Sequence, residues 1–426
     1  MVTVSGSTIQ TQLPLQAVPG VVLPKQRPVF LDILSIDSFR YLWMSNGLSF
    51  MGMRVRDMIT AWLVLEMTGS GLWVGLVNGL PAISIIVFSL LGGVMADRTD
   101  RRVLLLWSRL ALASLTFMSA FLVMTGMIQL WHLTIIVILA VGVNAQDMSV
   151  SRIFLMDIVG KDRLLSATSL TSVLMDIGII VGPFVAGVIT ADLGTDAALF
   201  LLGGVYLIAF ASVFFIKNTS NTNDKKQTRV LKDLLEGLSY IRRTPQVAWL
   251  VSLSATVPMA GVFFFTMSIY AQDVLQVGSQ GLGIIIAIYG VGALIGSLYM
   301  TARDKINHKS LVVLLSALVY AGGMAVFALS GEMYISLAAA FFVGVSSTFW
   351  KNTTSTMVQT STADDMRGRV MSIFGMGVQM LALGWLLGGI LATLIGNQGT
   401  LLIASALMAG LNLFVYLKTR AIAQAE

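Results

Sequence analysis

About twelve apolar runs of roughly 20 residues constrain this chain more than any other feature of its sequence. A helix of that length crosses the hydrocarbon core of a bilayer, where each backbone polar group must be satisfied within the protein. The runs therefore predict an all-α integral membrane protein. We expect spans at residues 41–66, 72–96, 103–126, 131–155, 165–191, 197–216, 247–271, 281–302, 310–330, 333–353, 370–395 and 399–418.

The composition agrees with a chain that faces lipid. Of its 426 residues, 56% are hydrophobic and 11% are charged, whereas a soluble domain carries about 25% charged residues. The absence of cysteine excludes disulfides and thiolate chemistry. The two histidines, His132 and His308, lie far apart in sequence and cannot form a metal cluster by themselves. We expect neither a metal nor another cofactor.

Lysine and arginine are distributed unevenly between the two sides of the predicted spans. With a cytoplasmic N-terminus, 22 of the 27 fall in inner connections and tails, and the other five lie within spans. None falls in an outer connection. Because positive residues are retained on the cytoplasmic side, both termini are predicted to be cytoplasmic. The same bias explains the net charge of +6 without nucleic acid as a partner.

The longest inner connection, residues 217–246, divides the spans six and six. Its second part, RVLKDLLEGLSYIRR, repeats apolar residues at helical spacing, which predicts an amphipathic helix on the inner membrane face. The predicted organisation is a flexible cytoplasmic tail at 1–37, a six-helix bundle at 38–216, the linker at 217–246, a second six-helix bundle at 247–418 and a cytoplasmic tail at 419–426.

Two charged segments recur at nearly the same offset. GVMADRTDRR begins at Gly93 and GSLYMTARDKINHK begins at Gly296, 203 residues later. Arg163 in GKDRLLSATSL precedes Arg367 in DMRGRVMSIF by 204 residues. Parallel repeats are common in transporters, so the offset favours two related halves.

The short hinge GGVMADRTDRR at 92–102 concentrates three arginines and two aspartates between apolar runs. Three interpretations fit these residues: an anchor on lipid headgroups, a patch for an anionic partner, or part of a moving joint. The residues alone leave all three open.

Four segments carry a resemblance to a known family. They are Gly93, Asp97, Arg98, Arg101 and Arg102 after the second span, Arg367 and Arg369 in DDMRGRVMS, EGLSYIRRTP at 236–245, and GIIVGPFVAG with Gly178, Gly182, Pro183 and Gly187. Over about residues 38–418 the chain resembles the major facilitator superfamily, in the branch of drug, macrolide and siderophore (enterobactin) exporters. It departs from the family pattern at Asp100, where the broad motif usually has glycine, and by lacking an earlier glycine before 178–187.

The resemblance implies two pseudo-symmetric six-helix bundles that rock around a midplane site. It also implies a gate, in which Asp97 and the arginines after it join the halves on the inner side when the cavity faces outward. We expect Asp97 to meet a helix N-terminus near the start of span eleven, beside Arg367 and Arg369. Lipid anchoring is then a lesser role for Arg101 and Arg102.

Eight charges fall inside predicted spans, where each costs at least about 2.5–3.5 kcal/mol and so faces a cavity or a partner. They are Arg54, Arg56, Asp57, Arg109, Asp147, Arg152, Asp176 and Lys351.

Several of these charges have expected partners. Arg54 and Asp57 can meet as an i,i+3 pair, either as a structural pair or with Asp57 switching partners during transport. Arg56 points about 100° away from its neighbour and is expected to need a partner on another helix. Arg109 and Arg152 are expected to snorkel to the inner surface.

The proton-coupling candidates are Asp147, Asp57 and Asp176. A carboxylate removed from water holds a proton more readily, and a neighbouring cation opposes this. Since Asp57 has arginines beside it, Asp147 is the better candidate, with a buried Asp147–arginine pair as the alternative. Asp176 precedes Gly178 and Gly182, whose spacing predicts close packing of this helix against the other half.

The resemblance places helices one, four, seven and ten around the central cavity. The substrate-cavity candidates are Arg54, Asn144, Tyr270, Trp350 and Lys351. The seventh span is rich in phenylalanine and methionine, which suits an amphipathic ligand, although helix packing or lipid contact is the alternative for most of these residues.

The sequence contains no GxxxxGK[ST], HExxH or nucleophile-elbow motif, so we expect neither an ATP motor nor an enzyme. The resemblance favours a secondary active transporter, with proton-coupled efflux of amphipathic drug- or siderophore-like small molecules. We expect a monomer in a bacterial inner membrane, in contact with lipids. The alternative is gradient-driven transport of a specific anionic or zwitterionic metabolite. The repeat and the gate-like motifs disfavour a non-coupled receptor or scramblase.

Overall fold

The computed structural model describes residues 33–82, 84–85, 88, 99–160, 163–216, 230–302, 308–378 and 380–423. Throughout these ranges the regular elements are helices and no strand occurs, which confirms the all-α prediction. The helices before the linker are α2 (Asp37–Thr68), α3 (Gly71–Gly79), α5 (Arg101–Met124), α6 (Leu130–Val159), α7 (Leu164–Leu193) and α8 (Thr195–Phe214).

The linker helix and the second half follow. They comprise α9 (Val230–Arg243), α10 (Pro245–Ser252), the 3₁₀ turn η1 (Leu253–Thr256), α11 (Val257–Ile269), the π-helical turn η2 (Tyr270–Val274), α12 (Gly278–Thr301), α13 (Lys309–Leu329), α14 (Met333–Thr360), α15 (Arg367–Val378) and α16 (Leu381–Ala423). The elements from α10 to η2 run without interruption and form one span.

Nine segments of the described chain are long and apolar enough to cross a membrane. The first predicted span, α2, is not among them and carries three charges near its middle. The second predicted span extends past α3 into residues outside the described ranges. The last two predicted spans fall in one continuous segment, Arg367–Thr419. These three differences account for the gap between nine segments and about twelve expected spans.

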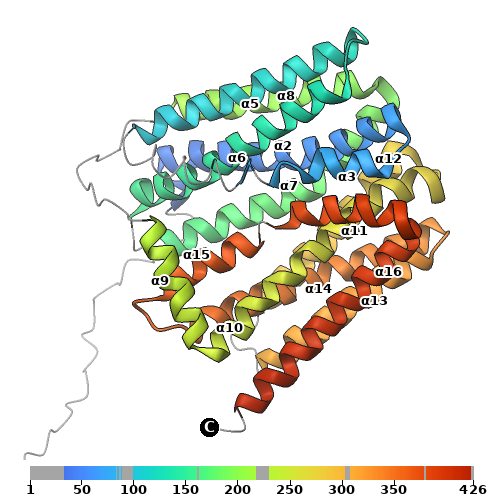
Figure 1. Cartoon of the computed structure of the whole chain (residues 1–426). Helices are drawn as coiled ribbons and strands as arrows, with labels where there is room; N and C mark the ends of the chain where they lie inside the picture. The colour runs from blue at the N-terminus through green and yellow to red at the C-terminus, as the bar shows by residue number, and fades with distance from the viewer. Residues whose placement is uncertain are drawn as a thin grey trace, which may run out of the picture.

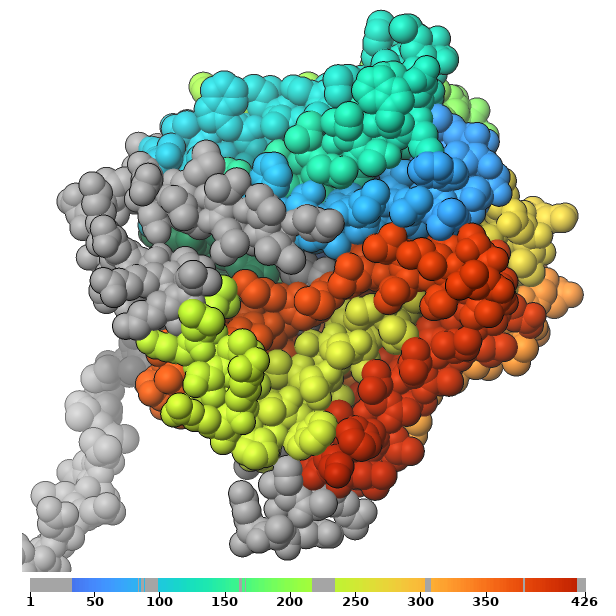
Figure 2. All heavy atoms as spheres, viewed as in Figure 1, coloured from blue at the N-terminus to red at the C-terminus, as the bar shows by residue number. Residues whose placement is uncertain are grey.

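The helices on each side of the linker pack mainly with one another. Before it, α5 packs on α8, and α2 packs on α7 and α8; after it, α11 and α13 pack on α16, and α12 and α13 pack on α14. The two sides meet along two seams, α7 with α12 and α3 with α16 (Figure 1). Figure 2 shows the blue surface of α3 lying against the red surface of α16.

Glycines make both seams possible, because they let two helix backbones touch. A Cβ added at Gly75 would stand 2.6 Å from the carbonyl oxygen of Trp385 in α16. A Cβ at Gly187 would stand 2.7 Å from the carbonyl oxygen of Ser279 in α12. Side chains do not tolerate contacts this short, so larger residues would push the halves apart.

Left-handed glycines end helices at the side of the bundle opposite α9, which we call the far end. Gly69, with φ of 58°, caps α2, and Gly396, with φ of 75°, breaks α16 into its two spans. Glycine adopts positive φ values without strain, so the helix can end and the chain can reverse direction at these two positions.

The linker helix α9 forms as predicted, and one of its faces docks on the second half. Glu236 pairs with Arg369 of α15 at 3.1 Å, and the Tyr240 hydroxyl accepts a hydrogen bond from the Ala363 N–H at 3.2 Å. Gly237 lets the backbones of α9 and α15 approach, while Leu235 remains 60% exposed. Figure 1 shows α9 lying across α15 at that end of the molecule.

Candidate functional site

Seven of the eight charges of the predicted spans, all but Arg152, gather in two groups. We call Asn46, Arg109, Asp147 and Ser151, which lie on α2, α5 and α6, the buried network. We call Arg54, Arg56, Asp57, Asp176, Tyr289 and Lys351, which lie on α2, α7, α12 and α14, the interface cluster.

The buried network is an ion pair held by hydrogen bonds. Arg109 Nη1 lies 2.8 Å from Asp147 Oδ2, and the two side chains are 1% and 4% exposed. Asn46 Oδ1 accepts hydrogen bonds from Arg109 Nη2 at 2.9 Å and from Ser151 Oγ at 3.0 Å. Of the two interpretations of Asp147, the structure shows the second, a buried ion pair with an arginine. The prediction that Arg109 snorkels was wrong, because this carboxylate holds its guanidinium inside the helix bundle.

Several polar atoms around this network have no partner within the described part of the chain. Asp147 Oδ1, Arg109 Nε and the hydroxyl of the fully buried Tyr206 are among them. An unsatisfied buried polar group costs about 1–3 kcal/mol. The network is therefore not fully satisfied. Asp147 Oδ1 is available to a proton or a water molecule, and Arg109 Nε and the Tyr206 hydroxyl are available to donate to water.

On α2, the interface cluster begins with an ion triplet. Asp57 Oδ2 lies 3.4 Å from Arg54 Nη1, as the i,i+3 spacing predicted. Asp57 Oδ1 lies 3.1 Å from Arg56 Nη2, so the expectation of a partner for Arg56 on another helix was wrong. The long arginine side chain reaches back to its neighbour even though their Cα–Cβ directions diverge. Arg54 also stacks over Phe50, with 5.2 Å between the guanidinium carbon and the ring centre.

The cluster continues on the other three helices. Asp176 of α7 and Lys351 of α14 are close enough for their charges to interact. Arg54 and Asp176 both act electrostatically on Tyr289 of α12, whose hydroxyl donates a hydrogen bond to Ser347 at 3.1 Å. Side chains from both sides of the linker therefore share one charged neighbourhood, with two carboxylates and three cations.

Three predicted cavity residues lie buried inside a half. Trp350 is 7% exposed and donates from Nε1 to Asn412 of α16 at 2.8 Å. Tyr270 is 2% exposed, and its hydroxyl donates to the Ala328 carbonyl at 2.7 Å. Asn144 is 5% exposed and donates to the carbonyl four residues before it. These hydrogen bonds hold the three side chains inside the helix bundle, so we do not include these residues in the proposed site.

The structure describes only some of the predicted gate residues of the first half. Gly93, Asp97 and Arg98 lie outside the described residues. Arg101 pairs with Asp157 at the end of α6, and Arg102 donates to carbonyls at the end of α8, so both hold α5 to its own half.

The gate residues of the second half behave similarly. Arg367 pairs with Asp364 and donates to the Gln359 carbonyl at 3.1 Å. Arg369 instead binds Glu236 of the linker helix α9.

The predicted helix-packing motif of α7 splits between two neighbours. Gly178 and Gly182 face Met51 of α2, within the same half. Pro183 and Gly187 face α12, as expected for packing against the other half.

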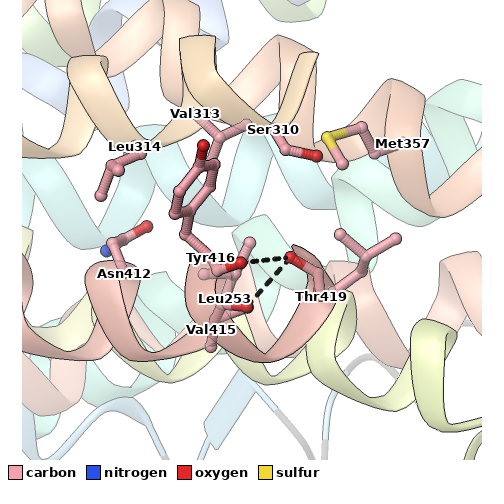
Figure 3. A pocket seen from close by; sticks show the side chains of 10 residues that line it. Leu253, Ser310, Val313, Leu314, Met357, Asn412, Val415, Tyr416 and Thr419 are labelled. Atoms are coloured by element: carbon pink, nitrogen blue, oxygen red, sulfur yellow. Dashed lines mark hydrogen bonds between the residues drawn. The ribbon is translucent and has the colours of Figure 1, made fainter. Parts of the chain in front are cut away.

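The structure also has a partly open pocket that no residue of either charged group lines. It spans about 260 Å³, open solvent included, between α10, α13, α14 and α16, and Figure 3 shows Tyr416, Asn412 and Thr419 on its wall. No charged side chain lines it. Because the interface cluster carries the charges and lies elsewhere, we do not treat this pocket as the substrate site. Across the described ranges, no group of three or more histidine, aspartate or glutamate residues has the arrangement of a metal site.

A family model described as a transmembrane secretion effector matches residues 31–426. The chain belongs to this family of the major facilitator superfamily. Members are transporters and not enzymes, so the transporter prediction is confirmed at the level of the family.

Curated relatives of this transporter are distant but match most of its length. It is 24% identical over 359 residues to the multidrug efflux pump Tap of Mycolicibacterium fortuitum, covering 81% of this chain and 86% of the relative. It is 24% identical over 391 residues to the enterobactin exporter EntS of Shigella boydii, covering 89% of each.

Solved transporters share its fold. A bacterial homologue of the human lysosomal transporter Spinster, inward-facing and unoccupied, superposes with a TM-score of 0.75 at 12% identity, covering 93% of this chain and 98% of that one. The nucleoside transporter NupG superposes with a TM-score of 0.71 at 14% identity, covering 90% and 98%. The predicted major facilitator fold is confirmed.

Proposed function

We propose that this transporter works by alternating access and couples proton entry to the efflux of amphipathic, drug- or siderophore-like small molecules. The observation that carries the proposal is the interface cluster, in which α2 and α7 of one half and α14 of the other contribute opposite charges beside Tyr289 of α12. Charges shared by two moving halves change partners when the halves rock, and that exchange is what coupling requires.

In the proposed cycle, Asp176 and Asp57 bind and release protons at the interface between the halves. Asp147 binds and releases a proton inside the first half. A proton on Asp176 cancels its attraction for Lys351, and the freed cation can then face a different partner. A substrate in the cavity competes for the same groups, so proton and substrate occupy the transporter alternately. Asp147 remains a coupling candidate because protonation would release Arg109.

Gating is proposed for the linker end, as the family resemblance implies. Asp97, Arg98 and Gly93 would join Arg367 and Arg369 of the second half when the cavity faces outward. We propose further that the chain acts as a monomer in a bacterial inner membrane with both termini cytoplasmic. The distribution of lysine and arginine supports this orientation.

A second candidate function is transport of a specific anionic or zwitterionic metabolite by the same cycle. The observation that favours it is a pair of cations in the cluster, Arg54 and Lys351, of which Arg54 is partly exposed and Lys351 is exposed. A carboxylate or phosphate on a substrate would bind between them.

Reconstituted vesicles test the proposal. Purified transporter in liposomes with an acidic interior is expected to accumulate ethidium, an amphipathic dye, and to stop when an ionophore collapses the pH gradient. Asp176→Asn is expected to abolish this dependence on the gradient. Dye movement that ignores the gradient in the unmodified transporter would refute proton coupling. Gradient-driven uptake of one metabolite without dye movement would favour the second candidate.

A further inference from the structure

A buried tyrosine, Tyr206 of α8, lies within electrostatic reach of both the buried network and the ion triplet of α2. Its side chain is 0% exposed, and its hydroxyl has no hydrogen-bond partner within the described ranges. Arg56 and Asp57 of α2, Arg109 of α5 and Asp147 of α6 are all close enough for their charges to act on the phenol. The hydroxyl thus sits amid both ion pairs and is bound to neither.

The backbone of α2 makes room for this side chain at Gly52. A Cβ at Gly52 would stand 2.8 Å from Tyr206 Cζ and 3.1 Å from its hydroxyl oxygen. The phenol therefore rests against α2 one helical turn before Arg56. Any larger residue at position 52 would displace the ring.

Exposure falls from one side of the tyrosine to the other. The Asp57 side chain is 35% exposed, whereas the Asp147 side chain is 4% exposed. Asp147 Oδ1 and Arg56 Nη1 are buried and unpartnered, as the Tyr206 hydroxyl is. A hydroxyl can donate and accept at the same time, which neither carboxylate nor guanidinium does when ionised.

We propose that Tyr206 relays protons between Asp57, whose side chain is partly exposed, and Asp147, which is enclosed in the first half. The proposal rests on the proton coupling proposed above. A protonated Asp57 gives its proton to the tyrosine oxygen through water, while the phenolic proton passes, also through water, to Asp147 Oδ1. The O–H bond on Asp57 breaks, one forms on Asp147, and the phenol is neutral before and after.

The relay has a structural consequence inside the first half. Once Asp147 carries the proton, its ion pair with Arg109 is lost, and the guanidinium keeps only its hydrogen bond to Asn46 of α2. The contacts among α2, α5 and α6 therefore depend on a proton delivered from Asp57. Proton entry is in this way linked to the packing of three helices in the moving half.

Tyr206→Phe tests the relay, because it removes the hydroxyl and keeps the ring. Tyr320→Phe is the matched control: Tyr320 is 2% exposed, its hydroxyl is also unpartnered, and it packs beside Phe263 in the second half. Removing an unpartnered hydroxyl does not weaken folding, so both variants are expected to be as heat-stable as the parent. Gly52→Ala, which pushes the ring away from α2, is a second disruption of the relay.

The readout is ethidium accumulation in liposomes with an acidic interior, in H₂O and in D₂O. Tyr206→Phe is expected to slow gradient-driven accumulation by about tenfold or more and to enlarge the solvent isotope effect, because proton delivery becomes limiting. Tyr320→Phe is expected to change neither. A merely structural loss would slow transport without enlarging the isotope effect and would overturn the relay.

Normal transport by Tyr206→Phe, with the parent still driven by the gradient, overturns the relay and leaves the proposed function standing. Transport by the parent that ignores the gradient overturns both.

Discussion

Removing the negative charge of Asp147 should destabilise the fold far more than removing that of Asp57. Asp147→Asn leaves the Arg109 guanidinium charged, 1% exposed and without a counter-ion. Breaking a buried pair from one side costs about 3–5 kcal/mol, because the remaining charge is neither solvated nor neutralised. Asp57→Asn removes a carboxylate that is 35% exposed and pairs with Arg54, 30% exposed, and with Arg56, 8% exposed. The exposed pair is worth about 0–1 kcal/mol. Losing the pair with Arg56 adds to this cost, but the total stays below the cost at Asp147, because the Asp57 site remains partly open.

Unfolding of the purified transporter in mixed micelles, followed by circular dichroism as the fraction of SDS rises, measures both variants. The double variant Arg109→Met with Asp147→Leu is the control, since replacing a buried pair by apolar residues is neutral or stabilising by about 1–4 kcal/mol. We expect Asp147→Asn to lose several kcal/mol and the double variant to recover it. Equal losses for Asp147→Asn and Asp57→Asn, or a double variant as unstable as the single one, would refute the buried pair.

Further predictions follow from contacts elsewhere in the fold. Gly384→Ala places a Cβ 2.0 Å from a carbonyl oxygen of α11 and should cost about 1–3 kcal/mol in the same unfolding assay, whereas Gly375→Ala, with open space around it, should be neutral. Gly237→Leu should detach α9, because even its Cβ would stand 3.0 Å from a side chain of α15, and limited proteolysis should then cut the linker faster. Lys351→Gln should reduce gradient-driven dye accumulation, and combining it with Asp176→Asn should reduce it no further, because each removes one side of the same interaction.

The sequence was sufficient for the features that depend on one helix at a time. Runs of apolar residues predict spans because a bilayer demands them, and the i,i+3 spacing predicts the contact between Arg54 and Asp57 because both lie on one helix. The glycines of α7 predict close packing because backbones meet only where side chains are absent.

Contacts between helices were harder to predict, because hydropathy gives neither the rotation of a helix nor its neighbours. Arg109 was expected at the surface, although a signal for its real partner exists. It lies eight residues from the start of α5, and Asp147 lies twelve from the end of α6. At 1.5 Å per residue these depths differ by only about 6 Å. Matching opposite charges by their depth in the membrane would have paired Arg109 with Asp147. No comparable sequence signal predicts that Trp350 hydrogen-bonds to Asn412.

A disulfide cross-link between the two halves at the far end tests most directly whether they must separate there during transport. A Cβ at Gly71 of α3 would lie 3.9 Å from Cγ1 of Ile269 in α11, so thiols introduced by Gly71→Cys and Ile269→Cys stand within reach of a disulfide across the halves. The chain has no cysteine of its own, so no other thiol competes.

Gradient-driven dye accumulation is the measurement, with each single variant as control. The account predicts that oxidation of the double variant stops accumulation, that reduction restores it, and that neither single variant responds. Undiminished transport by the fully cross-linked protein would contradict alternating access between these halves.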